Sequence, residues 1–437
     1  MKKSLLAVAA LGAFASAAQA QSSVTVYGVM DVGYVGSNNR IANNTAVNTG
    51  TVSRNTASAF ADAAESTSRL GFKGTEDLGG GLSAFFTIET AITPNVQNAI
   101  SSSTSANRQT FAGLKKNGIG SFAFGTQYTT IHNAVAASDP GAQNNMMGNV
   151  IYDKITAGVS VAGGTGTTTA GSWQYAGNQN NTSYTVRGNN MLTLQSDTFA
   201  GFQANAFYLL NNQNANQSTT VSGNNTTISG GSTNHSGFGL GANYNWQKLL
   251  VTANFQQFTD KAPYTQTGTN QLYTSGNPIQ NGFGGNSAAG TNAKDNQQYY
   301  AATYDFGILK AYVQYVNRKT MDVNNPNNYV ARTAQQIGIR SFVTPAIEAW
   351  ASGGMGKLTV SNAYTGSNAF VVNTAGTGSN AAGFGAFQLG SNYWLSKRTN
   401  LYAIYGQQYT RNQSWTTNGN PTSYNSNAYA LGLRHTF

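Results

Sequence analysis

The chain has 437 residues with a formal net charge of +10, 50 glycines, 44 tyrosines and phenylalanines together, 7 prolines and no cysteine. The lack of cysteine excludes disulfide scaffolds and thiolate metal sites. Beyond the first 20 residues no run of about 18 apolar residues occurs, which excludes helical membrane spans. Abundant Gly, Asn, Thr, Tyr and Phe instead favour strands and turns.

The first 20 residues have the pattern of a secretory signal peptide. Lys2 and Lys3 precede an apolar run at 5–18, and Ala18-Gln19-Ala20 forms a cleavage site. A buried N-terminal helix is the alternative, but polar residues at helical spacing are missing. We therefore expect two parts, a signal peptide at 1–20 and one barrel domain at 21–437. Removing the two lysines lowers the formal charge from +10 to +8.

Apolar and polar residues alternate from Val24 to Tyr34, which predicts a strand with one face for hydrocarbon and one for water. The same pattern recurs along the chain and predicts sixteen strands in total. They are expected at 24–34, 66–74, 81–92, 107–114, 119–128, 184–196, 200–211, 236–246, 248–259, 297–306, 308–319, 331–343, 345–356, 382–394, 399–411 and 425–437.

The connections alternate between short turns and long Asn-, Gly- and Thr-rich loops, such as 36–65, 129–183 and 260–296. Short turns on one side and long loops on the other are typical of outer-membrane barrels. A soluble barrel is the alternative, but side chains cannot fill the inside of sixteen strands. The sequence thus predicts an all-β, sixteen-stranded antiparallel transmembrane β-barrel, with turns and termini in the periplasm. Aromatics near strand ends (Tyr244, Trp246, Tyr304, Phe306, Tyr393 and Trp394) suit an interfacial girdle.

Strand parity assigns the charged residues to a face. If Leu70 and Phe72 face the lipid, then Arg69 and Lys73 face the inside of the barrel, because successive side chains alternate between the two faces. The inward direction is favoured for charged residues, since a charge on the lipid face costs about 2–4 kcal/mol at the bilayer midplane. In the same way, an outward-facing Phe111 places Arg108 on the inner face. Outward-facing Leu192 and Leu194 place Arg187 on the inner face. Nine basic residues are placed inside against two acids, Asp31 and Glu89. The nine are Arg69, Lys73, Arg108, Arg187, Lys310, Arg318, Arg332, Arg340 and Arg434.

The inventory of catalytic residues is poor. Of the three histidines, His132 lies near Ser138 and Asp139 in the long third loop, but that loop has no pattern, and we expect a solvated histidine rather than a triad. No two histidines have metal-ligand spacing. Glycine runs lack the strand and helix context of nucleotide loops. We therefore expect no enzyme, metal or cofactor, and the scattered basic residues favour no nucleic acid.

Several segments resemble the general porins of Gram-negative bacteria, most closely the proteobacterial trimeric type. These are 68–82 (SRLGFKGTEDLGGGL), 23–29 (SVTVYGV), 107–114 (NRQTFAGL), 199–202 (FAGF) and 431–437 (LGLRHTF). The resemblance implies a homotrimer, a third loop (129–183) folded into the pore, basic positions on the pore wall, and a final Phe437 read by the barrel-assembly machinery. Many relatives have Gly-Arg-Gln where this chain has Gly125-Thr126-Gln127, so the resemblance does not imply the full family set of constriction arginines.

The expected function is passive diffusion of small hydrophilic solutes and ions through the outer membrane. We expect Arg69, Lys73, Arg108, Arg187 and Asp139 at the constriction, and a preference for anions. Acids of the third loop, Asp139 and Asp153, could instead cancel that preference. The alternatives are a substrate-specific channel, an outer-membrane enzyme and a surface adhesin with a barrel anchor.

Overall fold

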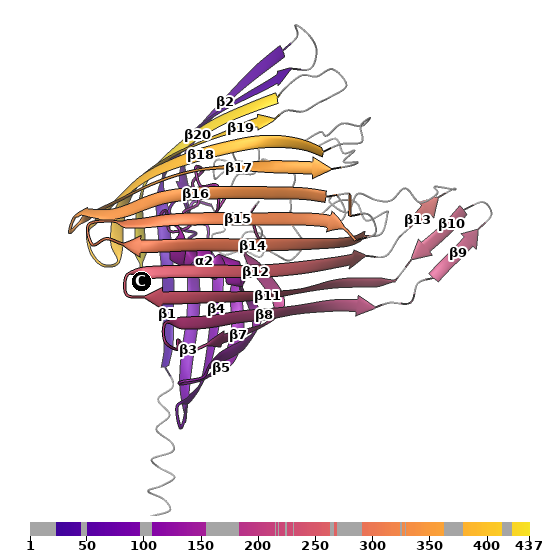
Figure 1. The fold of residues 1–437 in the computed structure, drawn as a ribbon, viewed down its shortest axis with the longest axis horizontal. Helices are drawn as coiled ribbons and strands as arrows, with labels where there is room; N and C mark the ends of the chain where they lie inside the picture. The colour runs from indigo at the N-terminus through magenta and orange to yellow at the C-terminus, as the bar shows by residue number, and fades with distance from the viewer. Residues whose placement is uncertain are drawn as a thin grey trace, which may run out of the picture.

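The computed structural model is a closed antiparallel β-barrel, shown in Figure 1. It describes residues 23–44, 50–96, 107–153, 183–214, 216, 218–222, 225–229, 231–262, 266–268, 291–323, 326–327, 329–361, 379–412 and 422–437. The barrel closes because β1 (Ser23–Asn44) pairs with β20 (Thr422–Thr436) over residues 29–42. The predicted signal peptide and residues 154–182 of the third loop lie outside the described residues.

Sixteen strands make up the wall, which confirms the expected number. β2 (Gly50–Asp62) and β3 (Arg69–Gly79) count as one, since both pair with β1. The others are β4 (Leu82–Ala91), β5 (Asn107–Lys116), β6 (Gly120–Tyr128), β7 (Arg187–Ser196), β8 (Phe202–Asn214), β11 (Ser232–Trp246), β12 (Leu249–Ala262), β14 (Thr291–Asp305), β15 (Lys310–Asp322), β16 (Tyr329–Thr344), β17 (Ile347–Ser361), β18 (Ser379–Trp394) and β19 (Thr399–Asn412).

Strand ends beside the short turns agree with the predicted ones, except that β3 continues to Gly79 where 74 was predicted. Several strands also extend further into the loops. The largest difference concerns the first predicted loop, 36–65. Most of it is strand, because β1 continues to Asn44 and pairs with β2 from Gly50 onward. The loop prediction was wrong there. The Asn-, Ala- and Thr-rich segment shows no alternation of apolar and polar residues, but strands can pair through their backbones without such alternation.

The break between β2 and β3 is stabilised by one buried carboxylate. Oδ2 of Asp31, on β1, accepts backbone N–H groups from Glu65 and Ser66, and Oδ1 accepts the hydroxyl of Tyr402 from β19. Residues 63–68 leave the ladder, so these N–H groups would otherwise lack a partner. Asp31 therefore lies inside the barrel, as parity predicts.

The two faces of the wall differ in polarity as expected. Exposed outer positions include Val313, Ile337 and Leu389, while the alternating inner positions hold buried polar groups such as Gln314 and Gln336. Most of the predicted girdle aromatics are exposed, Trp246 and Phe306 among them. Trp394 was assigned wrongly. Its indole N–H donates to Glu348 on the inner face.

Three short strands lie outside the barrel. β9 (Ser218–Ser222), β10 (Asn225–Ser229) and β13 (Gln266–Gly268) form a small separate sheet from two long loops. Figure 1 shows this sheet beyond the loop ends of β11 and β12, at the opposite end from the turns and the C-terminus. Among the described residues, no helix has the length and apolar character needed to cross a membrane.

The C-terminal Phe437 completes the seam of the barrel. Its backbone N–H and C=O pair with O and N of Gly28 on β1, each at 3.2 Å. Its ring lies against Gly28, where a Cβ would collide with it. The ring is 43% exposed and continues an outer row with Leu431 and Leu433.

We predict that deleting Phe437 lowers the yield of folded barrel, because the seam loses two backbone hydrogen bonds and its last outer aromatic. The yield is measured as the heat-modifiable form in membrane fractions. Phe437→Tyr keeps the ring and serves as the control, with a yield near that of the wild type. A normal yield after deletion would contradict the prediction.

Candidate functional site

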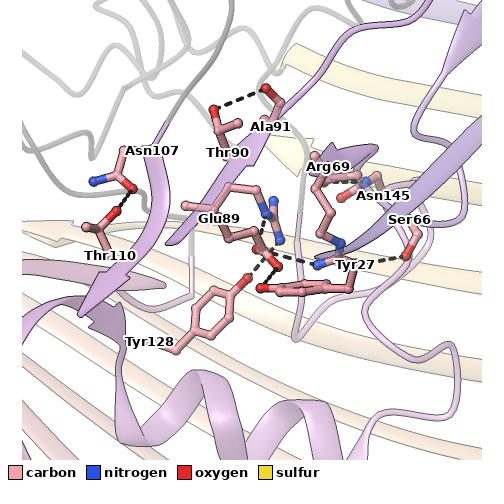
Figure 2. A network of polar contacts seen from close by, with 12 residues as sticks. Tyr27, Ser66, Arg69, Glu89, Thr90, Ala91, Asn107, Thr110, Tyr128 and Asn145 are labelled. Carbon is pink, nitrogen blue, oxygen red and sulfur yellow. Dashed lines mark hydrogen bonds and ion pairs between the residues drawn. The ribbon is translucent and has the colours of Figure 1, made fainter. Parts of the chain in front are cut away.

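Four of the predicted constriction residues converge on one inner wall. Arg69 and Lys73 come from β3, Arg108 from β5 and Arg187 from β7. We call these four residues the basic cluster. They surround Glu89 of β4 and two tyrosines, Tyr27 and Tyr128. Figure 2 shows the side chains of Arg69, Glu89 and the two tyrosines pointing toward one another.

Glu89 and Tyr128 organise the centre of the cluster. Nε of Arg108 donates to Oε1 of Glu89 at 2.7 Å, and its guanidinium also donates to the hydroxyl of Tyr128 at 2.7 Å. The hydroxyl of Tyr27 donates to the other carboxylate oxygen at 3.1 Å. Arg108 and Glu89 are both buried. Such charge-assisted hydrogen bonds fix the guanidinium in one orientation.

The other three basic residues are arranged around this pair. A guanidinium nitrogen of Arg69 lies 3.9 Å from Oε1 of Glu89, so one carboxylate faces two arginines. Arg187 stacks on the ring of Tyr128 at 5.0 Å, and Lys73 lies 5.3 Å from the centroid of Tyr27. Four cations and one anion give the cluster a formal charge of +3 (4 − 1).

Arg108 reaches the inside by a route that parity did not predict. Phe111 was expected on the outer face, but it pairs directly with Gly125 while the next residue, Ala112, pairs with Phe124, which is 60% exposed outside. Phe111 therefore lies on the inner face, where it contacts Phe85. Arg108 is inside because the ladder shifts register between Glu89 and Thr90, which makes it the extra residue of a β-bulge.

The described part of the third loop crosses to distant strands. Helix α2 (Thr130–Ser138) begins at the N-cap Thr129 and packs against β8, β11, β12, β14 and β15. Its apolar residues Ile131 and Val135 join a buried cluster with Val316 and Phe384 of the wall. After the helix, Asn145 contacts the break at 63–68 by donating to O of Ala63. The segment connecting β6 and β7 thus contacts inner-face residues of strands far along the sheet.

Buried glutamines hold this segment. Gln388 of β18 exchanges hydrogen bonds with Asn144 and donates to the carbonyls of Met146 and Met147. Gln336 of β16 accepts the backbone N–H of Val150 at 3.0 Å and donates to Gln314 on the neighbouring strand. Amide side chains can donate and accept, so they satisfy both the wall and the loop backbone without adding charge.

Three further inward arginines are paired with acids. Arg318 binds Asp295 through two nitrogens, and Arg340 binds Glu348 in the same bidentate manner. Arg332 donates to Asp153 of the third loop at 2.9 Å. The predicted ratio of nine inner bases to two acids was therefore wrong. The structure also places the carboxylates of Glu65, Asp139, Asp153, Asp260, Asp295 and Glu348 among inner-face groups.

Comparisons with known proteins agree with this architecture. A family model described as Gram-negative porin matches residues 7–413. The chain belongs to the Gram-negative porin family. It is 26% identical over the full length of both chains to an outer membrane porin protein of Bordetella pertussis, and 44% identical over 99 residues, a quarter of the relative, to outer membrane porin protein 32 of Delftia acidovorans.

Solved porins share the fold. The anion-selective porin from Comamonas acidovorans superposes with a TM-score of 0.58 at 18% identity, covering 95% of this chain and 100% of that one. The trimer form of OmpT from Vibrio cholerae gives 0.54 at 14% identity, covering 95% and 99%. This porin is therefore an outer-membrane protein of the Gram-negative type, and its family is one of passive channels rather than enzymes.

The predicted site residues of this porin fall into two groups. The structure brings Arg69, Lys73, Arg108 and Arg187 together, whereas Asp139 lies near another wall. Asp139 accepts hydrogen bonds from Asn149 and from Gln336 of β16. Burial raises the pKa of its carboxyl group, although the hydrogen bonds that it accepts act in the opposite direction.

His132 is not the solvated residue that we expected. It is buried against the rings of Tyr128, Tyr152 and Tyr184. Ser138, which lies near it in the sequence, bonds to O of Ala134 and to the hydroxyl of Tyr299, so the structure places no triad there. Within the described ranges, no three His, Cys, Asp or Glu side chains group as metal ligands.

The glutamines of the inner wall were missed by sequence reasoning. Gln256, Gln297, Gln314, Gln336 and Gln388 are among the largest fully buried side chains. Each glutamine lies at an inward-facing position of its strand. The repetition of uncharged amides at inward-facing positions of neighbouring strands was the sequence signal that could have identified them. Parity analysis of charges alone could not detect them.

We predict that Gln388→Leu lowers the local stability of residues 144–148 in the third loop, because the substitution removes hydrogen bonds to Asn144, Met146 and Met147. A loss of about 2 kcal/mol of local stability corresponds to roughly 30-fold faster amide exchange. Hydrogen exchange of a peptide covering 144–148 measures the change. Gln335→Leu, on the outer face of β16, is the matched control and should leave that exchange rate unaltered.

Proposed function

We propose that this porin prefers anions and that the basic cluster is the selectivity element of its pore. The observation that carries the proposal is local. The wall around Glu89 gathers four cations from three strands, and two of them lie within ion-pair distance of that carboxylate. On β15 and β16, in contrast, Arg318, Arg332 and Arg340 each have an acid within that distance. Small hydrophilic anions passing this wall gain electrostatic stabilisation, and small cations lose it.

The size of the effect follows from Coulomb's law. A unit charge at about 6 Å contributes about 0.7 kcal/mol even with the dielectric constant of water. A net charge of three therefore contributes about 2 kcal/mol before screening. The Debye length is about 10 Å at 0.1 M salt, so salt screens only part of this interaction energy across a narrow pore. We expect anions to permeate several times better than cations, with a smaller difference at high salt.

Acids of the third loop are the main opposing influence. Asp153 is bound by Arg332 on β16, so both charges are largely compensated there. Asp139 is hydrogen-bonded to Gln336 and Asn149, away from the basic cluster. The total inner charge is thus close to balanced, and the preference depends on where the bases lie rather than on their number.

We predict that the double variant Arg69→Glu, Arg108→Glu shifts the zero-current potential across a KCl gradient from anion toward cation preference. The cluster charge changes from +3 to −1, which reverses the sign of the local field. Lys397→Glu, in a short turn outside the cluster, is the control and should leave the potential near the wild-type value. A cation-selective wild type, or an unaltered double variant, would refute the proposal.

We also propose that the third loop narrows the pore and that the protein is a homotrimer. Helix α2 and residues 139–150 contact inner-face groups of β12, β14, β16 and β18. A segment bound in this way occupies cross-section that water would otherwise fill. The trimer form of OmpT, a structural neighbour with the same fold, supports the oligomeric state.

We predict that deleting residues 139–149 raises single-channel conductance in planar bilayers, because the loop no longer fills part of the lumen. Deleting 218–229, which removes part of the small sheet beyond the barrel, is the control and should leave conductance nearly constant. An unchanged conductance in a correctly assembled 139–149 deletion argues against an inserted loop.

A further inference from the structure

The outer wall of the barrel carries an apolar groove of about 860 Å³. It crosses the wall from β4 to β14. Leu114, Phe122, Leu194, Leu240 and Phe255 line it with large side chains. These residues belong to the outer parity, since Phe122, Leu194 and Leu240 are 38%, 51% and 58% exposed. The volume lies in the range of small-molecule and cofactor sites.

The groove is hollow because small residues form its floor. Ala204, Ala242 and Ala253 pair directly across β8, β11 and β12, and Ala253 pairs with Tyr300 of β14. On the next strands, the same layer of the ladder carries larger groups, namely Tyr315, Gln335 and Met355. A depression between large apolar side chains accommodates a flexible hydrocarbon chain.

The groove rises from the turn edge into the membrane. It begins at Lys116 and Ser196, the last residues of β5 and β7. It ends at Tyr300, five residues from the end of β14. Five residues correspond to about 17 Å along a strand, roughly half of the hydrocarbon thickness.

The only cation lining the groove within the described part of the chain stands at the turn edge. Lys116 donates one hydrogen bond to the carbonyl of Gly80, and an ammonium group has three N–H donors. Ser196 lies at the same level, with Gly120 between them, because Lys116 and Ser196 both pair with Gly120. A cation and a hydroxyl at the edge, followed by apolar surface, complement an anionic head group attached to an acyl chain.

We propose that this groove binds one anionic phospholipid from the periplasmic leaflet. The phosphate contacts Lys116 and Ser196, and one acyl chain lies over the alanine floor toward Tyr300. The site is separate from the basic cluster, which lies on the inner face. It therefore concerns the lipid environment of the barrel and not ion selectivity.

The test is native mass spectrometry of the purified mature protein in detergent, incubated with phosphatidylglycerol or phosphatidylethanolamine of identical chains. The wild type should retain more phosphatidylglycerol than phosphatidylethanolamine. Ala242→Phe with Ala253→Leu fills the groove and should reduce retention at least tenfold. Lys116→Gln should remove the preference for the anionic lipid while retaining some binding of both lipids.

Controls separate the site from general changes in the barrel. Ala351→Leu repeats one of the two bulky substitutions on the outer face of β17, and Lys397→Gln removes a cation from another turn, so neither should alter retention. Unchanged retention in the filled variant, or an unchanged preference in Lys116→Gln, would overturn the proposal. So would disulfide cross-linking between subunits through Ala242→Cys, because a second copy would then cover the groove. Ion selectivity is measured in parallel and should be unaffected by every one of these variants.

Discussion

Closure of the backbone hydrogen-bond ladder is the constraint on which the rest of this structure depends. In hydrocarbon an unpaired backbone group costs several kcal/mol, so a sheet in the membrane cannot keep free edges. The pairing of β1 with β20, completed by Phe437 against Gly28, removes the last edge. Only after closure does each strand have one face toward lipid and one toward the inside, and that separation gives every side chain its environment.

The inner face then has to satisfy many polar groups without becoming a strongly charged surface throughout. Buried glutamines do this for the third loop, and bidentate pairs such as Arg318 with Asp295 do it for the arginines. Where the register shifts, the wall presents a residue that regular pairing would have turned away, as at Arg108. The same irregularity places an extra cation beside Glu89, so the basic cluster depends on a defect in the ladder.

Charge separation, rather than net charge, distinguishes the two inner walls. The wall formed by β3, β5 and β7 gathers four cations around one carboxylate, while β14 to β17 carry arginines paired with acids. Paired charges contribute mainly to structure, because their fields cancel within a few ångströms. Unbalanced charges are the ones that a passing ion encounters.

The sequence by itself determined the class, the number of strands, their turn-side ends and the face of most charged residues, because side-chain alternation is a local property of an extended chain. Only the tertiary structure decided the rest. Strand extension through 36–62 follows from pairing between β1 and β2, the inward turn of Arg108 from a bulge, and the acid partners of Arg318, Arg332 and Arg340 from contacts with other segments. The burial of His132 likewise depends on where the third loop contacts the wall. None of these has a local signature, since each arises from residues that meet only when the sheet closes.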